Sequence, residues 1–470
     1  MKKIKLSGLA VISAALLTFY SCSKSNTETT TVSVPPPVIS NPISDAAPLH
    51  GAIKGTMLSG KTYTIDADVV IQKGDTVMLQ NDVKVNVIVT PTIHPVIAVY
   101  GVLISLGTKD KPNTFTVPGA VKTDYPTANP NTDPAWSGTY NWCGIQCDTA
   151  CKLLVLKWTH IEFTGGLFNS SNTQFVYGTS SGSKSYGMMF QNTYGSFVME
   201  DSWFYGGVDD PIRIQSGKIH IMRNTFEKGG FIGGDVLNAK SGTVGDMAYN
   251  LFVGTATNGT KASNKGGSPV QCNVNMYNNT YINGGYRQVQ TGRSGCANYE
   301  EGAKGMAYNN LMVNCKFSFR VVGNPAADTI NMSYGYNYRY GDSDNVTGQF
   351  YPTGYITVPR STDIPSPSSY LPTPYVLGQT YTPPASLRGA NNPKFVNYPL
   401  PATSAHLMDI NYATGFDFHL QSGSPALGKG YTSFSAIAPI PVNPIYGATE
   451  ITPPGSDIGC YQSNGKGNQH

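Results

Sequence analysis

Charged side chains that could take part in chemistry recur in two neighbouring segments of similar sequence. Asp209 and Asp210 precede Arg213 in the first segment. In the second, Asp235 aligns with Asp210 and is followed by Lys240. Carboxylate oxygens are the ligands that Ca²⁺ prefers, so the three aspartates are candidate calcium ligands. Arg213 or Lys240 is then the candidate base that takes a proton from a bound substrate. The competing interpretation assigns these residues to turn capping and to solvated strand faces.

The two segments are copies of a repeat with a period of about 25 residues. A period in this range is typical of a solenoid, in which each unit packs on its neighbours. Apolar and polar residues alternate within each copy, as in strands with one buried face, and Ser-Gly or Gly-Gly pairs separate the strands. The residues predicted to point inward are Ile212, Ile214, Ile219, Ile221, Leu237 and Ala239. We therefore predict an all-β fold, a single-stranded right-handed parallel β-helix solenoid with a C-terminal capping region.

Asparagines occupy matching places in the successive copies, at Asn224, Asn250, Asn279 and Asn310. A buried Asn at a turn can bond the backbone of its own coil and of the next coil, which satisfies polar groups that the turn leaves unpaired. We therefore interpret these residues as a structural ladder. Binding of a glycan by the same residues is the alternative.

Several segments resemble the right-handed parallel β-helix proteins of the pectate-lyase-like superfamily. They are residues 96–116, the segment 142–166 that begins Trp142-Cys-Gly-Ile145, and Met276-Tyr-Asn-Asn-Thr-Tyr281. In that family a cation neutralises a uronate carboxylate and acidifies the adjacent C–H, and a basic residue removes the proton. The resemblance thus implies a polysaccharide lyase that acts on uronate-containing glycans, with Ca²⁺ as its cofactor.

The resemblance is not complete, and a second family is also similar. The Arg-x-Pro-x-x-Arg segment of the lyases is not matched, because residues 265–275 contain Pro269 and no Arg. The Asp-Asp and Ile-x-Ile pattern of residues 209–214 also resembles polygalacturonases, in which carboxylates hydrolyse the glycosidic bond. Asp201 would be the further carboxylate of such a site. Whether the chain is an enzyme is left open here, with a glycoside hydrolase as the second possibility.

A run of tyrosines supplies a separate candidate surface. Tyr334, Tyr336, Tyr338 and Tyr340 alternate with other residues, which predicts four rings on one face of a strand. Sugars stack on aromatic faces, so Tyr336 and Tyr338 are the candidate substrate-binding residues. Alternating tyrosines also simply suit a strand. This surface supports the alternative function of a non-catalytic, glycan-binding or adhesin-like β-helix protein.

The N-terminus predicts export. Residues 1–21 read as a lipoprotein signal peptide, because a lysine-rich start is followed by the apolar stretch Leu9 to Tyr20. The Ser21-Cys22 junction resembles the lipobox of bacterial lipoproteins, and this resemblance implies that Cys22 is lipidated. The expected location is the outer membrane or the cell surface, with a lipid anchor in the membrane. Residues 22–48 are rich in Ser, Thr and Pro and predict a flexible tether.

The remaining boundaries follow from changes in composition. Residues 49–340 are assigned to the β-helix, and residues 341–401 to a proline-rich excursion, because proline is excluded from central strands. Residues 402–470 resemble the terminal module of bacterial surface β-helix proteins. They are predicted to be a cap, since the last coil of a solenoid exposes unpaired strand edges.

The balance of charges limits the kinds of partner that we expect. Without Lys2, Lys3 and Lys5, 29 basic residues face 28 acidic ones. The sequence contains no basic patch of the kind that binds nucleic acid, so the expected partners are a polysaccharide and a membrane, and the expected state is a monomer.

The four-residue spacing of Cys143, Cys147 and Cys151 does not match zinc ligands. It predicts a disulfide from Cys151 to one of the other two, with at least one thiol left unpaired.

Overall fold

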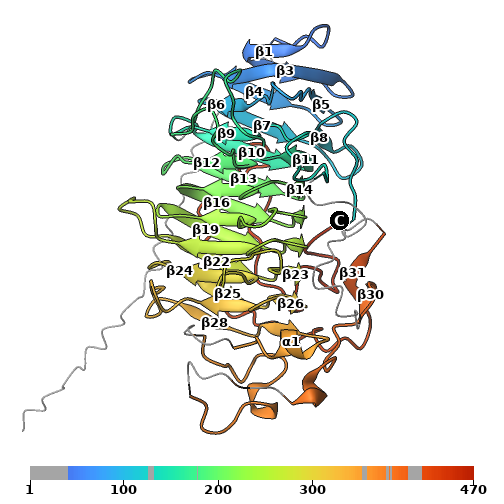
Figure 1. The fold of residues 1–470 in the computed structure, drawn as a ribbon, viewed down its shortest axis with the longest axis vertical. Coiled ribbons are helices and arrows are strands. Elements are labelled where there is room, and N and C mark those ends of the chain that lie inside the picture. Colours follow the sequence, from blue (N-terminus) through green and yellow to red (C-terminus); the bar gives the residue numbers. More distant parts are fainter. Residues whose placement is uncertain are drawn as a thin grey trace, which may run out of the picture. The chain divides into compact units, whose positions relative to one another are not determined.

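The computed structural model describes residues 41–124, 132–176, 178–351, 357–376, 381, 384–400 and 415–470. In this part the chain is almost entirely β-structure and winds as a right-handed parallel β-helix solenoid, which confirms the predicted fold class (Figure 1). No described helix is long and apolar enough to span a membrane.

Each complete coil contributes one strand to each of three faces. The first face is a ten-stranded parallel sheet. The other parallel strands form a second and a third face, which the long strand β3 joins into one 19-stranded sheet. The strands of the first face are β2 (Gly55–Met57), β4 (Thr76–Leu79), β7 (Val102–Leu106), β10 (Leu153–Lys157), β13 (Ser196–Glu200), β16 (Gly217–Met222), β19 (Thr243–Ala248), β22 (Asn273–Tyr277), β25 (Met306–Tyr308) and β28 (Ser333–Gly335).

The second and third faces follow the same order along the chain. The strands of the second face are β3 (Thr62–Ile71), β5 (Lys84–Val87), β8 (Asn113–Thr116), β11 (Thr159–Thr164), β14 (Trp203–Gly206), β17 (Thr225–Glu227), β20 (Leu251–Val253), β23 (Thr280–Ile282), β26 (Leu311–Val313) and β29 (Tyr338–Tyr340). Those of the third face are β6 (Ile97–Val99), β9 (Ile145–Cys147), β12 (Met188–Phe190), β15 (Ile212–Ile214), β18 (Leu237–Ala239), β21 (Thr260–Ser263), β24 (Ala297–Glu300) and β27 (Phe319–Val321), with β1 (Leu49–Ala52) pairing on β3.

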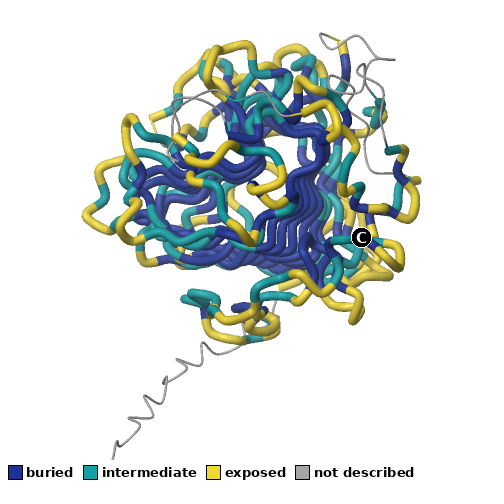
Figure 2. The backbone as a smooth tube through the Cα atoms, turned by 90° about the horizontal axis from the view of Figure 1, so that it is seen from below, coloured by how far each residue is buried: buried dark blue, intermediate teal, exposed yellow. Residues whose placement is uncertain are grey.

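The core runs through the inside of the stacked coils, where buried segments of successive coils superimpose (Figure 2). All six residues predicted to point inward are fully buried, so the alternation of the sequence identified the inner faces correctly. Aromatic rings also stack from coil to coil. Phe226 lies 5.0 Å from Phe252, and Phe252 lies 4.8 Å from Tyr281, between ring centroids. These contacts fix the register of the second face, because a one-residue slip would turn every ring outward.

The predicted asparagine ladder is confirmed. Asn250 Oδ1 accepts the backbone N–H of Asn224 at 3.0 Å, and Asn279 Oδ1 accepts that of Asn250 at 3.0 Å. Asn310 continues the series, and the ladder extends further than predicted, to Asn337 and then to Asp363. The amide nitrogens donate in turn to carbonyls of the preceding coil, as from Asn250 to Ile221 at 3.1 Å.

A residue in the left-handed region precedes each ladder asparagine. These residues are Arg223, Tyr249, Asn278, Asn309 and Tyr336, with φ between 51° and 61°. Such a conformation is unfavourable for a residue with a Cβ, and the ladder bonds that follow it compensate for the cost. The same turn repeated on successive coils forms a column, which we call the turn column.

The C-terminal region packs along the outside of the coils. It runs back alongside the coils, as the red part of the chain in Figure 1 shows, and its backbone accepts hydrogen bonds from, and donates them to, side chains of the turn column. Tyr249 donates to the carbonyl of Pro453, and Asn278 Oδ1 accepts the N–H of Gly455. Further along, Ile440 packs against the early coils of the first face. The side chains of the turn column thus hold residues 431–470, which we call the strap.

The proline-rich region covers part of the end of the last coil. Ile364 pairs in parallel with Tyr338, and Arg339 N–H donates to the carbonyl of Ile364 at 2.8 Å. This region also holds α1 (Asp344–Thr347), η1 (Pro367–Ser369), η2 (Ala385–Leu387) and β30 (Phe395–Asn397), and β30 pairs with β31 (Asp417–Leu420) of the C-terminal region. The backbone of residues 363–364 satisfies part of the last coil, which is what an open strand edge requires.

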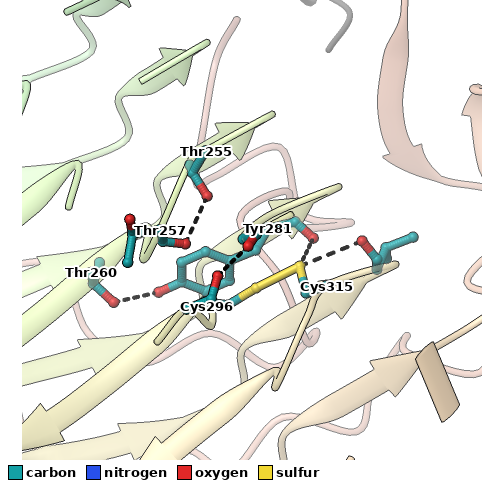
Figure 3. Close-up of a disulfide and its surroundings, with 9 residues drawn as sticks. Thr255, Thr257, Thr260, Tyr281, Cys296 and Cys315 are labelled. Carbon is teal, nitrogen blue, oxygen red and sulfur yellow. Dashed lines mark hydrogen bonds between the residues drawn. A yellow bond between two sulfur atoms is a disulfide. The ribbon is translucent and has the colours of Figure 1, made fainter. Parts of the chain in front are cut away.

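The predicted cysteine pairing is wrong. Cys296 and Cys315 form a disulfide, whereas Cys143, Cys147 and Cys151 are buried and unpaired. Cys143 packs in a separate cluster from the core that contains Cys147 and Cys151. The disulfide joins the residue before β24 to the turn after β26. Beside it the hydroxyl of Tyr281 lies 2.8 Å from that of Thr260 (Figure 3).

Candidate functional site

All five residues predicted for metal binding and proton transfer line one cleft. These are Asp209, Asp210, Arg213, Asp235 and Lys240, and the cleft lies on the outer side of the third face. Its volume is about 710 Å³, and it extends over the successive coils of β15, β18, β21, β24 and β27. The alignment of two repeat copies therefore placed these residues on neighbouring coils of one cleft.

Charged side chains dominate the lining of the cleft. The cationic ones are Arg213, Lys240, Lys261, Lys265, Arg293 and Arg320, and the anionic ones are Asp209, Asp210, Asp235, Glu300 and Glu301. Sequence analysis did not identify the members from residue 261 onward. The signal that could have found Lys261 is its place in Thr260-Lys-Ala-Ser263, which pairs with β18 in the way that β18 pairs with β15.

Two of the cations form ion pairs inside the cleft. Arg213 Nε lies 2.6 Å from Asp210 Oδ2. Lys261 Nζ lies 3.3 Å from Asp235 Oδ2 and 2.8 Å from Glu300 Oε1. Arg213 also stacks on the ring of Tyr186, at 4.6 Å from the centroid.

The carboxylates of Asp210 and Asp235 are buried within a network of hydrogen bonds. The amide of Asn238 donates to both, at 2.9 Å to Asp210 and 3.1 Å to Asp235. Asp235 also accepts the amide of Asn258 at 2.6 Å. Burial raises the pKa of Asp210. Burial opposes ionisation of Asp235 as well, but the charge of Lys261 and the bond from Asn258 hold its pKa below the ordinary value.

The geometry does not fit the predicted calcium site. Among the described residues, no three His, Cys, Asp or Glu side chains lie together as a group that could hold a metal ion. The oxygens of Asp210 and Asp235 face Arg213, Lys261 and two asparagine amides, so cationic side chains stand where a metal ion would bind. The physical reason is the next coil: the repeat continues with Lys261 rather than with a further carboxylate.

Lys240 differs from Arg213 and Lys261 in its pKa and in its lack of an ion pair among the described residues. Its side chain is buried, with 7% of the residue exposed. Burial lowers its pKa, and the charges of Lys261 and Arg213 lower it further. In the described part of the chain no carboxylate lies within ion-pair distance of its amine. A lysine in such an environment becomes neutral more readily than an ordinary one and can then accept a proton.

The predicted tyrosine face is not formed. The segment divides into β28 and β29, because the left-handed turn at Tyr336 separates the two strands. Tyr336 stacks on Tyr431 of the strap, with 5.0 Å between ring centroids. Tyr338 is fully buried, and its hydroxyl donates to the carbonyl of Asn391. Neither residue lines the cleft.

Asp201, the further carboxylate required by the hydrolase interpretation, does not line the cleft either. It forms a two-point ion pair with Arg223, at 2.7 Å and 2.9 Å. The neighbouring Glu200 accepts the backbone N–H of Thr449 at 2.9 Å and lies 2.8 Å from His220. These charges hold the strap on the outside of the first face.

The disulfide supports one wall of the cleft. Gln288, Gly292, Arg293 and Ser294 belong to the loop between β23 and β24, and Cys296 ends that loop. Arg320 donates to the carbonyl of Ser294 and, at 3.1 Å, to that of Gly292. The covalent link and the guanidinium together fix the position of the loop beside the third face.

Comparisons of the chain with protein-family models, with curated proteins and with solved structures find no match. The function is therefore inferred from the cleft.

Proposed function

We propose that the cleft binds an acidic polysaccharide and that Lys240 serves as the base in its eliminative cleavage. The observation that carries the proposal is the state of Lys240, a buried amine in the cleft. Burial and the charges of Lys261 and Arg213 lower its pKa more than Asp235 and Asp210 raise it, and its amine forms no ion pair with a described carboxylate. Perturbed titratable groups in a cleft mark functional sites more often than chance. The resemblance to the pectate-lyase-like superfamily supports the same substrate class.

The charges that remain after internal pairing favour an anionic ligand. Arg213 and Lys261 are paired with carboxylates, but no described carboxylate forms an ion pair with Lys240, Lys265 or Arg293. Lys265 and Arg293 are exposed on opposite sides of the cleft, one after β21 and one before β24. A uronate polymer would bring carboxylates to these cations, and a groove with cationic walls attracts such a ligand.

The proposed reaction is a β-elimination. The neutral amine of Lys240 takes the proton from C5 of a uronate, and the electron pair of that C–H bond forms the C4=C5 double bond. The C4–O4 bond breaks, and the leaving oxygen takes a proton from water. Arg213 and Lys261 stabilise the negative charge that develops on the uronate carboxylate during proton removal.

The experiment is an assay of polygalacturonate, alginate and hyaluronan for unsaturated products, which absorb in the near ultraviolet. We expect Lys240→Met to lower the rate by about 10²-fold or more, since a positioned general base contributes that much. Lys218→Met is the matched control, because Lys218 lies exposed on the first face. Activity should persist in a chelator. Loss of activity in chelator would support calcium at the aspartates, and full activity of Lys240→Met would overturn the assignment of the base.

Glycan binding without cleavage is the second candidate function. It is favoured by the internal ion pairs, which leave Arg213 and Lys261 partly neutralised before any ligand arrives. In that case the wild-type protein would be retarded in a gel containing the polymer but would release no unsaturated product. New reducing ends without the absorbance would indicate a hydrolase instead.

We also propose that the protein is exported and held at the outer membrane or the cell surface by acyl chains on Cys22. The support is the sequence of residues 1–22 alone, because residues 1–40 lie outside the described part of the chain. A surface location would give the cleft access to polymers that cannot cross a membrane.

A further inference from the structure

One column of outward-facing residues crosses the cleft from coil to coil. The strand pairing sets Arg213 beside Asn238, Asn238 beside Lys261, Lys261 beside Asn298, and Asn298 beside Arg320. Cations and amides therefore alternate along the axis. Neighbouring coils are about 4.8 Å apart, so consecutive cations are separated by roughly 9.6 Å.

The amides of the column have an unused acceptor. Asn238 and Asn298 are 2% and 0% exposed, and each uses its Nδ2 to donate to carboxylates of the cleft. Their Oδ1 atoms have no hydrogen-bond partner among the described residues. A buried acceptor without a donor is unfavourable, and a hydroxyl group of a ligand is a donor that could satisfy it after a small movement of the side chain.

The first cation of the column also has donors to spare. Arg213 uses its Nε for Asp210, whereas its two terminal nitrogens have no partner in the described residues. A guanidinium presents several N–H groups in a fixed plane, so it can bind a second carboxylate without releasing the first. The ion pair with Asp210 then orients Arg213 for the ligand.

We infer that the polymer bears one acidic group on every second sugar. The inference rests on the proposed binding of an acidic polysaccharide in the cleft. Each sugar of an extended chain advances by a distance close to one coil spacing, so alternate sugars meet Arg213 and Lys261. The sugar between them meets Asn238, whose Oδ1 accepts a bond from a neutral hydroxyl group. A polymer with a charge on each sugar would bring a carboxylate against this acceptor.

The test compares two polymers of different charge spacing. Hyaluronan carries one uronate in each disaccharide, and polygalacturonate carries one on each sugar. We expect the wild-type protein to bind hyaluronan about tenfold more tightly than polygalacturonate at equal salt and equal uronate concentration, in affinity gels and by calorimetry. Dextran, which is neutral, should not bind.

Variants then test the column itself. Asn238→Lys puts a cation on an intermediate coil, and we expect it to shift the preference toward polygalacturonate. Asn86→Lys is the matched control, since Asn86 lies in β5 on the second face, away from the cleft. Wild-type binding that is equal for the two polymers, or tighter for polygalacturonate, would overturn the alternation and leave the proposed function standing. Binding of neither acidic polymer would overturn both.

Discussion

Lys240 and Arg213 lie on adjacent coils of one cleft, and their pKa values are shifted in opposite directions. Burial lowers the pKa of Lys240, and neighbouring cations lower it further. Burial also opposes the charge of Arg213, but its contact with Asp210 raises its pKa, so it stays protonated. Of the two bases predicted from the sequence, Lys240 is therefore the one that can accept a proton, and Arg213 is suited to hold a carboxylate.

The dependence of activity on pH follows from this difference. Lys240 accepts a proton only when it is neutral, so kcat/KM should rise with pH and level off above the pKa of Lys240. Lys261→Met removes a positive charge that lowers this pKa. We therefore expect the rising limb of the kcat/KM profile to move to higher pH in the variant and to stay in place in Lys218→Met. A limb that is unchanged or moves to lower pH would exclude Lys240 as the group that titrates.

The aspartates illustrate what the sequence could and could not tell about the site. Two similar repeat copies were enough to place Asp210, Asp235 and Lys240 on neighbouring coils. The sequence did not show what lies on the third coil, because the repeat is too degenerate there to align. There Lys261 approaches Asp235 and takes the place of a metal ion. The prediction of a tyrosine face was wrong for another reason. The left-handed turn at Tyr336 divides the run of alternating tyrosines into two separate strands.

At the scale of elements, the asparagine ladder is what holds the turns between the first and second faces. Each side chain accepts a buried backbone N–H and donates to a carbonyl of another coil, so neighbouring coils share the same bonds. The ladder also includes a serine, since the hydroxyl of Ser202 accepts the N–H of Thr159 and Ser202 donates its own N–H to Asn224, and it ends at Asp363. Acceptors of three kinds can thus fill one structural position.

Removing one member of the ladder should weaken the solenoid locally. Asn250→Ala leaves the buried N–H of Asn224 without its acceptor. A buried unsatisfied group costs about 1–3 kcal/mol, so we expect the free energy of unfolding to fall by ~3 kcal/mol. Asn345→Ala is the control, because Asn345 is exposed in α1 and should change stability by less than about 0.5 kcal/mol. Chemical denaturation followed by circular dichroism measures both. Equal stability of the two variants would show that the ladder is dispensable.

The strands were predictable because their alternation reflects burial on one side of a pleated sheet. The role of the regions after residue 340 was not, because it depends on contacts with distant coils. Proline-rich sequence indicated only that central strands were excluded. Nothing in residues 431–470 indicates that Thr449 would bond Glu200 or that Tyr431 would stack on Tyr336. Such contacts join segments more than 90 residues apart and have no local pattern.

At the scale of the whole molecule, the strap and the cleft lie on different faces of the solenoid. The strap covers the turn column and the outside of the first face, and the cleft occupies the outside of the third face. Burial of Glu200 opposes its ionisation, but His220 and Lys157 lower its pKa to about 2, so its bonds to the strap hold at ordinary pH. The third face stays available for a long ligand that runs along the axis.

The proposed anchor completes this arrangement, and its prediction concerns the chain as a whole. If Cys22 carries acyl chains, two such chains supply stable attachment, whereas a single chain is only marginal. Cys22→Ala should therefore move the protein from the membrane fraction to the soluble exported fraction. Cys143→Ala is the control, because that thiol is buried inside the solenoid and should leave the distribution unchanged. Fractionation with immunodetection gives the distribution, and mass spectrometry of the first tryptic peptide tests for the acyl groups. Membrane retention of Cys22→Ala at the wild-type level would contradict lipidation at Cys22. Release of a protein that still binds the polymer would show that the anchor sets the location and the cleft sets the ligand.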